Sequence, residues 1–372
     1  MIVRSVRVGH FRNLVSQTIQ LSSGINLFVG GNGQGKTNFL EAIYFQSTLR
    51  SFRSARLRDL IQHGSENAEV ESGVDSEGVP IRLRVFIDGQ VRRLWLGGKA
   101  VRSAGEYLGL LRAVAFTPDD LAMVKGAPSL RRRFLDRAAF LFQASHLDDV
   151  RDFQTALRAR NRLLQDASGR SSDVELESFT ETLAACGARV STNRSRLLQR
   201  LESSVASILN RISEGRLEAR IRFEPGWRMG EGTDLEGETR SLACQMESKL
   251  RRDRKRGSTS IGPQLDDFEV LLSGDSVRRL ASQGQQRAVA VALMLSVVEE
   301  IVSSGGESPV ILLDDVSSEL ELRRRERLFE LVSEFGSQVL VTSTELDLLG
   351  ALADDASARF QIESGRILPI GG

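Results

Sequence analysis

The octapeptide Gly30–Thr37 constrains this chain more than any other stretch of its sequence. It reads GGNGQGKT and follows the apolar run Ile25–Val29, and Phe39, Leu40 and Ile43 after it fall on one face of a helix. A strand, a glycine-rich turn and a helix N-terminus in this order form a loop whose backbone N–H groups surround phosphates. The sequence therefore predicts a binding site for ATP or GTP.

The residues of this loop have distinct expected roles. The glycines let the backbone turn inward on the phosphates, Lys36 reaches the terminal phosphates, and the Thr37 hydroxyl can ligate Mg²⁺. The residues expected to bind ATP here are Gly30, Gly31, Asn32, Gly33, Gln34, Gly35, Lys36, Thr37 and Asn38. A glycine-rich turn without function is the alternative, and the strand and helix on either side disfavour it.

A second part of the site is expected near the other end of the chain. Residues 310–315, VILLDD, form an apolar run that ends in two acids. A bound triphosphate needs a carboxylate for its metal, normally at the end of a neighbouring strand, so Thr37 and Asp314 are the expected Mg²⁺ site. Asp315 is expected to act as general base, and Lys36, Asp314 and Asp315 are the expected catalytic residues. Without the phosphate loop, the default interpretation of this run is a buried strand that reaches a solvated acidic turn.

The segment SQGQQ precedes a strongly apolar helix. A serine, a glycine and a helix N-terminus together make a second anion pocket. One nucleotide can use two pockets for its terminal phosphate only if they approach from different faces, so we expect two copies of the chain to sandwich it. The residues expected to bind the ATP of the other copy are Ser282, Gln283, Gly284, Gln285 and Gln286. Taken alone, the segment could also be an N-capped buried helix.

The order of these motifs resembles that of ABC-type ATPases. Within that class, Ser317–Leu320 resembles the loop that crosses the dimer partner, and Val339–Thr342 resembles the next strand, whose end carries a switch residue. Transporter subunits have a histidine after that strand, where this chain has Ser343 and Thr344.

The opening RVGHFRNL, residues 7–14, resembles the first hairpin of the SMC, Rad50 and RecF group. In that group an Arg-Asn pair, here Arg12 and Asn13, lies near the nucleotide. The helical middle of this chain has irregular apolar spacing and cannot form the long coiled coils of SMC and Rad50 proteins. The short arm points to the RecF family.

Segments throughout the chain are similar to RecF segments, in RecF order. They are residues 47–54, 116–136, 262–274, 282–293 and 312–321. Two departures occur: Gln264 and Leu265 stand where the family usually has His and Arg, which removes positive charge from that turn, and Glu321 stands where Asp is usual.

The resemblance implies an α/β fold, with an ABC-type P-loop ATPase head of mixed sheet and antiparallel β layer and a second, mainly helical arm lobe. The alternating residues 69–74 and 80–98, with a turn at Asp88-Gly89, predict the antiparallel layer, and residues 360–368 predict a strand pair at the edge of the nucleotide-binding sheet. We expect the head at 1–128 and 258–372 and the arm at 129–257, with Ser129 as the cap of its first helix.

Three basic clusters could neutralise DNA phosphates, although the formal net charge is only +1. They are residues 131–133, 251–256 and 323–327. The second is favoured because it follows an arm helix and precedes the return to the head; its basic residues are Arg251, Arg252, Arg254, Lys255 and Arg256. None carries interleaved aromatic residues, so backbone contact with duplex DNA is expected, and a solvated face is the alternative for each.

The expected function is that of an ATP-dependent DNA-binding protein. The resemblance implies duplex DNA beside single-stranded gaps, partnership with RecR and often RecO, and loading of the RecA recombinase. ATP with Mg²⁺ would drive a homodimer that clamps DNA, and weak, DNA-stimulated hydrolysis would open it. The alternatives are a P-loop small-molecule kinase and an ABC transporter ATPase subunit. No apolar stretch is long enough for a signal peptide or membrane helix, which predicts a cytoplasmic protein without a membrane partner.

Overall fold

Two compact units make up the chain. The structure, a computed structural model, describes residues 1–54, 56–121, 123–166, 173–213, 217–230, 232, 234–315 and 320–370. Unit 1 comprises Met1–Ala122, Ser207–Arg216 and Gln283–Gly372, and unit 2 comprises Met123–Ala206 and Leu217–Ser282. These bounds differ from the lobe limits expected at 128/129 and 257/258, and the assignment of each lobe to a function stays a prediction.

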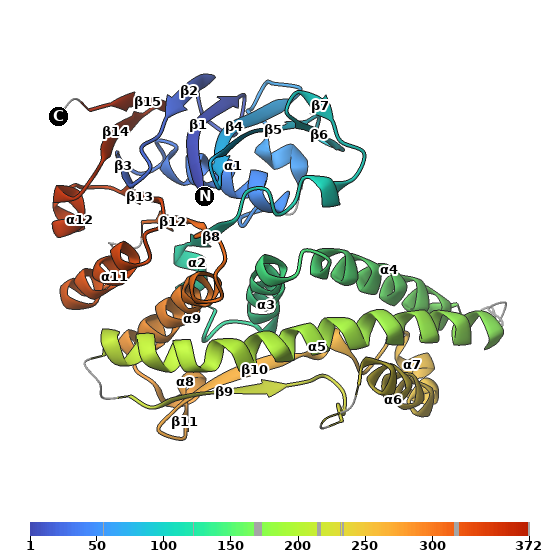
Figure 1. Cartoon of the computed structure of the whole chain (residues 1–372). Helices are drawn as coiled ribbons and strands as arrows, with labels where there is room; N and C mark the ends of the chain where they lie inside the picture. Colours follow the sequence, from blue (N-terminus) through green and yellow to red (C-terminus); the bar gives the residue numbers. More distant parts are fainter. Residues whose placement is uncertain are drawn as a thin grey trace. The chain divides into compact units, whose positions relative to one another are not determined.

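A mostly parallel sheet forms one layer of unit 1 (Figure 1). Among the described residues its order is β15-β14-β3-β13-β12-β8, and only β15 is antiparallel to its neighbour. Its strands are β3 (Ile25–Val29), β8 (Ala113–Phe116), β12 (Val310–Asp314), β13 (Val339–Ser343), β14 (Ala358–Glu363) and β15 (Arg366–Pro369). The predicted strands at 25–29 and 310–315 and the predicted terminal strand pair are confirmed. Parallel strands end at one edge of a sheet, so the residues after β3, β12 and β13 gather there.

The second layer of unit 1 is the predicted antiparallel sheet. Its order in the described part of the chain is β2-β1-β4-β5-β6-β7. Its strands are β1 (Ile2–Gly9), β2 (Gln17–Gln20), β4 (Ala68–Ser76), β5 (Val79–Ile87), β6 (Arg92–Leu96) and β7 (Lys99–Ala100). The predicted turn at Asp88 joins β5 to β6: the Asp88 N–H donates to the Val91 carbonyl, and the Val91 N–H donates to the Asp88 carboxylate. Alternating burial along β4 shows that one face meets the core.

Helix α1 (Lys36–Thr48) packs against both sheets. It contacts β8, β12 and β13 on one side and β4 and β5 on the other, and nearly all of its residues are buried. Phe28 of β3 lies between Phe39 of α1, with ring centroids 4.9 Å apart, and Phe360 of β14, which stacks on it at 4.8 Å. This packing fixes the start of α1 relative to the edge of the parallel sheet.

Among the described residues of unit 1, further helices lie around α9, which contacts the parallel sheet. Helix α9 is buried along almost its whole length and packs against α2, α11 and β8. These helices are α2 (Pro118–Leu121), α9 (Gln283–Ser303), α11 (Leu322–Glu334) and α12 (Ala351–Asp354), with 3-10 turns at Leu57–Leu60, Ala104–Glu106 and Asp347–Leu349.

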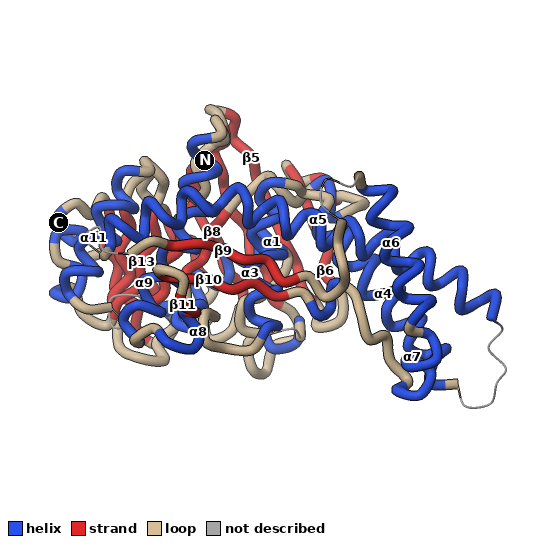
Figure 2. Tube along the Cα trace, turned by 90° about the horizontal axis from the view of Figure 1, so that it is seen from below, coloured by secondary structure: helices blue, strands red, loops and turns tan. Residues whose placement is uncertain are grey.

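In its described residues, unit 2 is mainly helical, with an antiparallel ribbon of three strands (Figure 2). Its helices are α3 (Pro128–Phe142), α4 (His146–Gln165), α5 (Asp173–Ile212, whose end belongs to unit 1), α6 (Leu235–Ser248), α7 (Leu250–Arg256) and α8 (Val277–Leu280), with a 3-10 turn at Pro263–Leu265. The ribbon is β9 (Ala219–Glu224), β10 (Asp267–Leu272) and β11 (Asp275–Ser276). Phe153, Leu183, Trp227 and Leu242 belong to the hydrophobic core of this unit.

Two expectations for unit 2 are wrong. Helix α3 begins at Pro128 after an Ala127 N-cap without a side-chain hydrogen bond, so Ser129 lies inside the first turn and does not cap it. Arg131, expected in an exposed basic cluster, is 2% exposed. Its guanidinium pairs with Asp267, with Nε 2.5 Å from Oδ1, because an arginine can be buried only with a partner for its charge.

A second buried arginine holds α7 to the rest of unit 2. Arg160 of α4 and Asp253 of α7 both have fully buried side chains, and Nη1 lies 3.0 Å from Oδ2. Arg160 also donates to the hydroxyls of Thr180 and Thr259. Removing one member of such a pair leaves an uncompensated buried charge.

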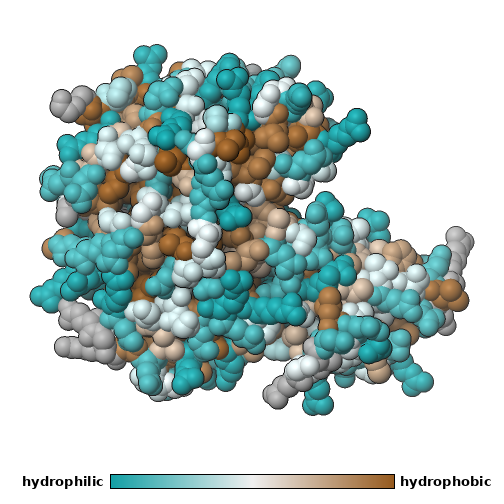
Figure 3. Space-filling model, viewed as in Figure 1, coloured by the Kyte–Doolittle hydropathy of each residue, from teal (hydrophilic) through white to brown (hydrophobic). Residues whose placement is uncertain are grey.

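In the described parts of the chain, no helix combines the length and the apolar character that crossing a membrane requires. Hydrophilic side chains cover much of the surface of α6 and α7 (Figure 3).

We predict that Asp253→Asn lowers the free energy of unfolding by about 3–5 kcal/mol, because it leaves Arg160 charged and unpaired in the core. The matched control is Glu236→Gln, which removes the exposed pair with Arg240 and is expected to cost less than about 1 kcal/mol. Urea unfolding monitored by circular dichroism measures both. Equal effects of the two substitutions would contradict the assignment of the Arg160–Asp253 pair.

Candidate functional site

The phosphate loop joins β3 to α1 as the sequence predicts. Gly33 and Gly35 have φ of 77° and 116°, values that suit glycine, and α1 begins at Lys36. Gly31, Asn32 and Gly33 are exposed, so the tip of the loop is open to a ligand. Gly30 is buried against β14, where a Cβ would overlap the carbonyl oxygen of Ile362.

Lys36 folds over this loop. Its Nζ donates to the carbonyl oxygens of Gly30 at 2.6 Å and Gly31 at 2.9 Å. Burial lowers the pKa of Lys36, and the charges of Asp315 and Asp314 act in the opposite direction. The Lys36 ammonium group therefore interacts electrostatically with both carboxylates.

Asp314 is held by two hydroxyl groups at the edge of the parallel sheet. Thr37 Oγ1 and Thr342 Oγ1 each donate to Asp314 Oδ1 at 2.8 Å, and the Asp315 N–H donates to Thr342 Oγ1 at 3.0 Å. Asp314 is 5% exposed, and burial raises its pKa although both hydrogen bonds favour the carboxylate. The residues from α1, β12 and β13 thus meet at one carboxylate.

The position of Asp314 corrects one expectation. We expected β12 to neighbour the strand of the phosphate loop, but β13 lies between β3 and β12. Thr342 of that intervening strand contacts both Asp314 and Asp315. The sequence predicts that Thr342 lies on the next strand, but not that its hydroxyl contacts Asp314. The sequence feature that could have identified Thr342 is a hydroxyl residue near the end of the apolar strand VLVTS.

The oxygens of Thr37 and Asp314 fit a magnesium ion, which prefers hard oxygen ligands and few protein groups when a phosphate supplies others. Among the described residues, no group of three or more His, Cys, Asp or Glu residues could hold a metal by itself. The donor set therefore suits a metal that arrives with a nucleotide.

Asp315 directly follows β12 with φ of 47°, in the left-handed region that aspartate tolerates better than most residues. This backbone conformation turns the chain at the end of the strand. The loop expected at Ser317–Leu320 lies outside the described residues except for Leu320.

The predicted Arg12–Asn13 pair contacts the loop and α1. Arg12 donates from Nε and Nη2 to the two oxygens of Glu41, at 2.9 and 2.7 Å, and Glu41 is fully buried. Asn13 Nδ2 donates to the Gly33 carbonyl at 2.9 Å, and Asn38 Nδ2 donates to Asn13 Oδ1 at 2.7 Å. Sequence reasoning missed Glu41, because one acid on a predicted helix carries no signal of its distant partner.

The turn between β14 and β15 supports the loop from the other side. The Ser364 N–H donates to Gln34 Oε1 at 2.6 Å, and the Gly365 N–H donates to the Gln34 carbonyl at 2.8 Å. The Gly365 carbonyl in turn accepts from the Val15 N–H. Gly365 has φ of 77°, and a Cβ there would overlap the Asn13 carbonyl oxygen. Only glycine fits this close approach.

The predicted second anion pocket lies at the start of α9, which begins at Gln283. Ser282 and Gln283 are exposed, whereas Gln286 is buried. A Cβ on Gly284 would overlap the guanidinium of Arg324, which comes from the predicted basic cluster 323–327 and is 25% exposed. Gly284 thus allows an arginine to lie against the helix N-terminus.

The favoured DNA-contact residues lie on one short helix. Arg251, Arg252, Arg254, Lys255 and Arg256 of α7 are all exposed, and Asp253 between them points into unit 2. Their contact with DNA stays a prediction.

Comparison with protein families and with relatives gives a consistent result. A family model described as the RecF/RecN/SMC N terminal domain matches residues 2–365. The chain is 39% identical to the DNA replication and repair protein RecF of Myxococcus xanthus, over 95% of this chain and 94% of that protein. It is 38% identical over the whole length of both chains to the protein of the same name from an Anaeromyxobacter species.

Solved structures agree with these relatives. One described as the recombination mediator protein RecF-ATPrS in the RecFOR pathway matches with a TM-score of 0.89 and 30% identity, over 99% of this chain and 98% of that one. An Smc head bound to the C-winged helix domain of ScpA matches with a TM-score of 0.58 and 17% identity, which shows the fold alone. The predicted ABC-type head with a helical arm is thereby confirmed.

We predict that Gly365→Ala weakens nucleotide binding by at least about tenfold, because it displaces Asn13 and the loop that Asn13 holds. Gly78→Ala is the matched control: Gly78 has φ of 80°, and nothing lies within 4 Å of the added Cβ. Both variants carry the strain of a left-handed alanine, so the loss of thermal stability in Gly78→Ala measures that strain alone, and Gly365→Ala adds the overlap with Asn13. Titration with a fluorescent nucleotide measures the affinities, and equal affinities would contradict the support assigned to this turn.

Proposed function

The chain belongs to the RecF family of DNA replication and repair proteins, and from that premise we propose that it is an ATP-dependent DNA-binding protein of recombinational repair. In this proposal ATP joins two subunits head to head, the dimer holds DNA, and slow hydrolysis releases it. The observation that carries the proposal is a phosphate loop joined to Asp314 together with a separate helix N-terminus, that of α9, at which Ser282 and Gln283 are exposed. Neither set alone requires a second subunit.

In one subunit, the loop residues Gly30–Asn38 surround the phosphates of ATP with backbone N–H groups. Lys36 exchanges its loop carbonyls for the terminal phosphates. Thr37 and Asp314 would hold Mg²⁺, which would neutralise phosphate charge. Asp315 accepts a proton from the attacking water. Arg12 and Asn13 fix the outer side of the loop through Glu41 and Gly33.

From the second subunit, Ser282 and the first-turn amides of α9 approach the terminal phosphate. Ser282 and Gln283 are exposed at this end of the helix. The positive end of the α9 dipole favours an anion there. Cleavage of the terminal phosphate removes the charge that both subunits bind, so the dimer opens.

DNA and protein partners complete the proposal. The exposed basic residues of α7 contact the phosphates of duplex DNA or of a junction with single-stranded DNA. A relative solved with an ATP analogue is described as a recombination mediator of the RecFOR pathway, which supports RecR and RecO as partners here. A small-molecule kinase and a transporter subunit, the two alternatives from the sequence, would both be indifferent to DNA.

We predict that Asp315→Asn protein is a monomer without nucleotide and a dimer with ATP and Mg²⁺, because it binds ATP but cannot remove the phosphate that joins the subunits. Light scattering measures the molar mass. Lys36→Met is the control and should stay monomeric at the same ATP concentration. An Asp315→Asn protein that stays monomeric with ATP would contradict the proposed function. A dimer of Asp315→Asn whose lifetime is no longer than that of the wild-type dimer would contradict the assignment of Asp315 as general base.

We further predict that the triple variant Arg252→Gln, Lys255→Gln, Arg256→Gln lowers the slope of log affinity for duplex DNA against log salt by about 2–3, roughly one per lost phosphate contact. Arg220→Gln, Arg228→Gln, Arg240→Gln removes the same charge outside α7 and should leave the slope unchanged. Fluorescence anisotropy at several salt concentrations measures both. The same slope in the two variants would exclude α7 as the contact.

A further inference from the structure

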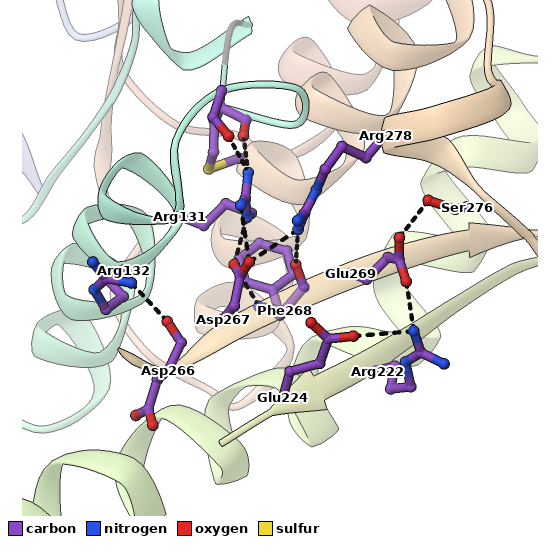
Figure 4. Close-up of polar contacts among 12 residues, drawn as sticks. Arg131, Arg132, Arg222, Glu224, Asp266, Asp267, Phe268, Glu269, Ser276 and Arg278 are labelled. Carbon is purple, nitrogen blue, oxygen red and sulfur yellow. Dashed lines mark hydrogen bonds and ion pairs between the residues drawn. The ribbon is translucent and has the colours of Figure 1, made fainter. Parts of the chain in front are cut away.

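Two carboxylates on β10 hold the segment of unit 2 that leads into Ser282 (Figure 4). Asp267 and Glu269 are two residues apart on one strand, so their side chains share a face of the ribbon. Arg278 Nη2 donates to Asp267 Oδ2 at 3.1 Å, and the Ser276 hydroxyl donates to Glu269 Oε1. Both donors belong to the short stretch between β10 and Ser282.

Arginines of neighbouring elements fix the same carboxylates. Arg131 of α3 donates to both oxygens of Asp267, with Nη2 2.9 Å from Oδ2, and Arg222 of β9 donates to Glu269 Oε2 at 2.6 Å. Burial acts to raise the pKa of Asp267, but Arg131, the Phe268 N–H and the charge of Arg278 together lower it. The hydrogen bond from Ser276 lowers the pKa of Glu269. Both groups are therefore ionised near neutral pH and have fixed orientations.

The segment itself is too short to be stable alone. Helix α8 has four residues, and a helix of that length depends on its neighbours for its position. Val277 is buried and Arg278 is partly buried, whereas Arg279 and Leu280 are exposed. Arg278 also donates to the Phe268 carbonyl at 3.2 Å, which adds a second tie to β10.

We infer that Asp267, Glu269, Ser276 and Arg278 are positioning residues for Ser282, the residue that our proposed function places on the ATP of a second subunit. The inference rests on that proposed function. Ser282 follows α8 after a single residue, Ala281, whose N–H donates to the Val277 carbonyl. Because Ser282 lies only four residues after Arg278, the contacts that fix Arg278 also restrict the position of Ser282. A serine hydroxyl recognises a phosphate only within hydrogen-bond distance, and a displacement of about 1 Å loses that bond.

The test measures dimerisation and nucleotide binding separately, in the full chain with Asp315→Asn. Arg278→Met keeps the length of the side chain and removes its guanidinium, and Arg279→Met makes the same charge change at the adjacent exposed position. We expect Arg278→Met to raise the dissociation constant of the ATP-dependent dimer by about tenfold, the effect of losing a charge-assisted hydrogen bond. The ATP affinity of the monomer should change less than about twofold.

The companion variants separate positioning from folding. Arg279→Met should leave both constants unchanged, Arg278→Lys should restore part of the dimer, and Ser276→Ala should weaken it in the same direction as Arg278→Met. If the parent dimerises with ATP and Arg278→Met dimerises equally well, the inference alone is wrong. If the parent stays monomeric, the proposed function fails and the inference fails with it. Loss of monomer ATP affinity or of folding in both Arg278→Met and Ser276→Ala would assign these residues to the fold of the subunit and overturn the inference.

Discussion

The carboxylate of Asp314 is the point on which the nucleotide site depends. Three elements that are distant in sequence meet there: Thr37 at the start of α1, Thr342 at the end of β13 and Asp314 itself at the end of β12. They meet because β3, β13 and β12 are parallel, so that their carboxyl ends lie at one edge. A buried anion needs such donors, and the two hydroxyls supply them. Lys36 adds the compensating positive charge nearby.

Local patterns predicted the parts of the site that are contiguous in the chain. GGNGQGKT and VILLDD each carry their strand, turn and chemistry within a few residues, and both occupy the expected elements. The supporting residues could not be found in that way. Glu41, Thr342 and Gly365 look ordinary where they stand, and each has its role through a partner that the sheet order brings close. Sheet order itself, with β13 between β3 and β12, leaves no periodic signal in the sequence.

In unit 2, the sequence pattern also fails to predict which charged residues are buried. Runs of arginine are most often solvated, so Arg131 was assigned to a surface cluster. Its partner Asp267 is 136 residues away, and the buried pair of Arg160 and Asp253 spans 93 residues. Only the folded chain shows which member of a basic run faces inward. In α7 the reverse holds: the inward residue is the single acid, and the five basic residues remain on the surface.

The support of the phosphate loop by the β14–β15 turn has a consequence for synthesis of the protein. A ribosome releases residues 25–37 early, but β13 and β14, the two neighbours of β3, follow about three hundred residues later, as the 330-residue separation of Ser364 and Gln34 illustrates. During that time β3 has neither of its strand partners, and unpaired apolar strands are prone to aggregate. Contacts of such long range also form slowly. The nucleotide site can therefore be completed only after the residues of β13, β14 and β15 have been synthesised.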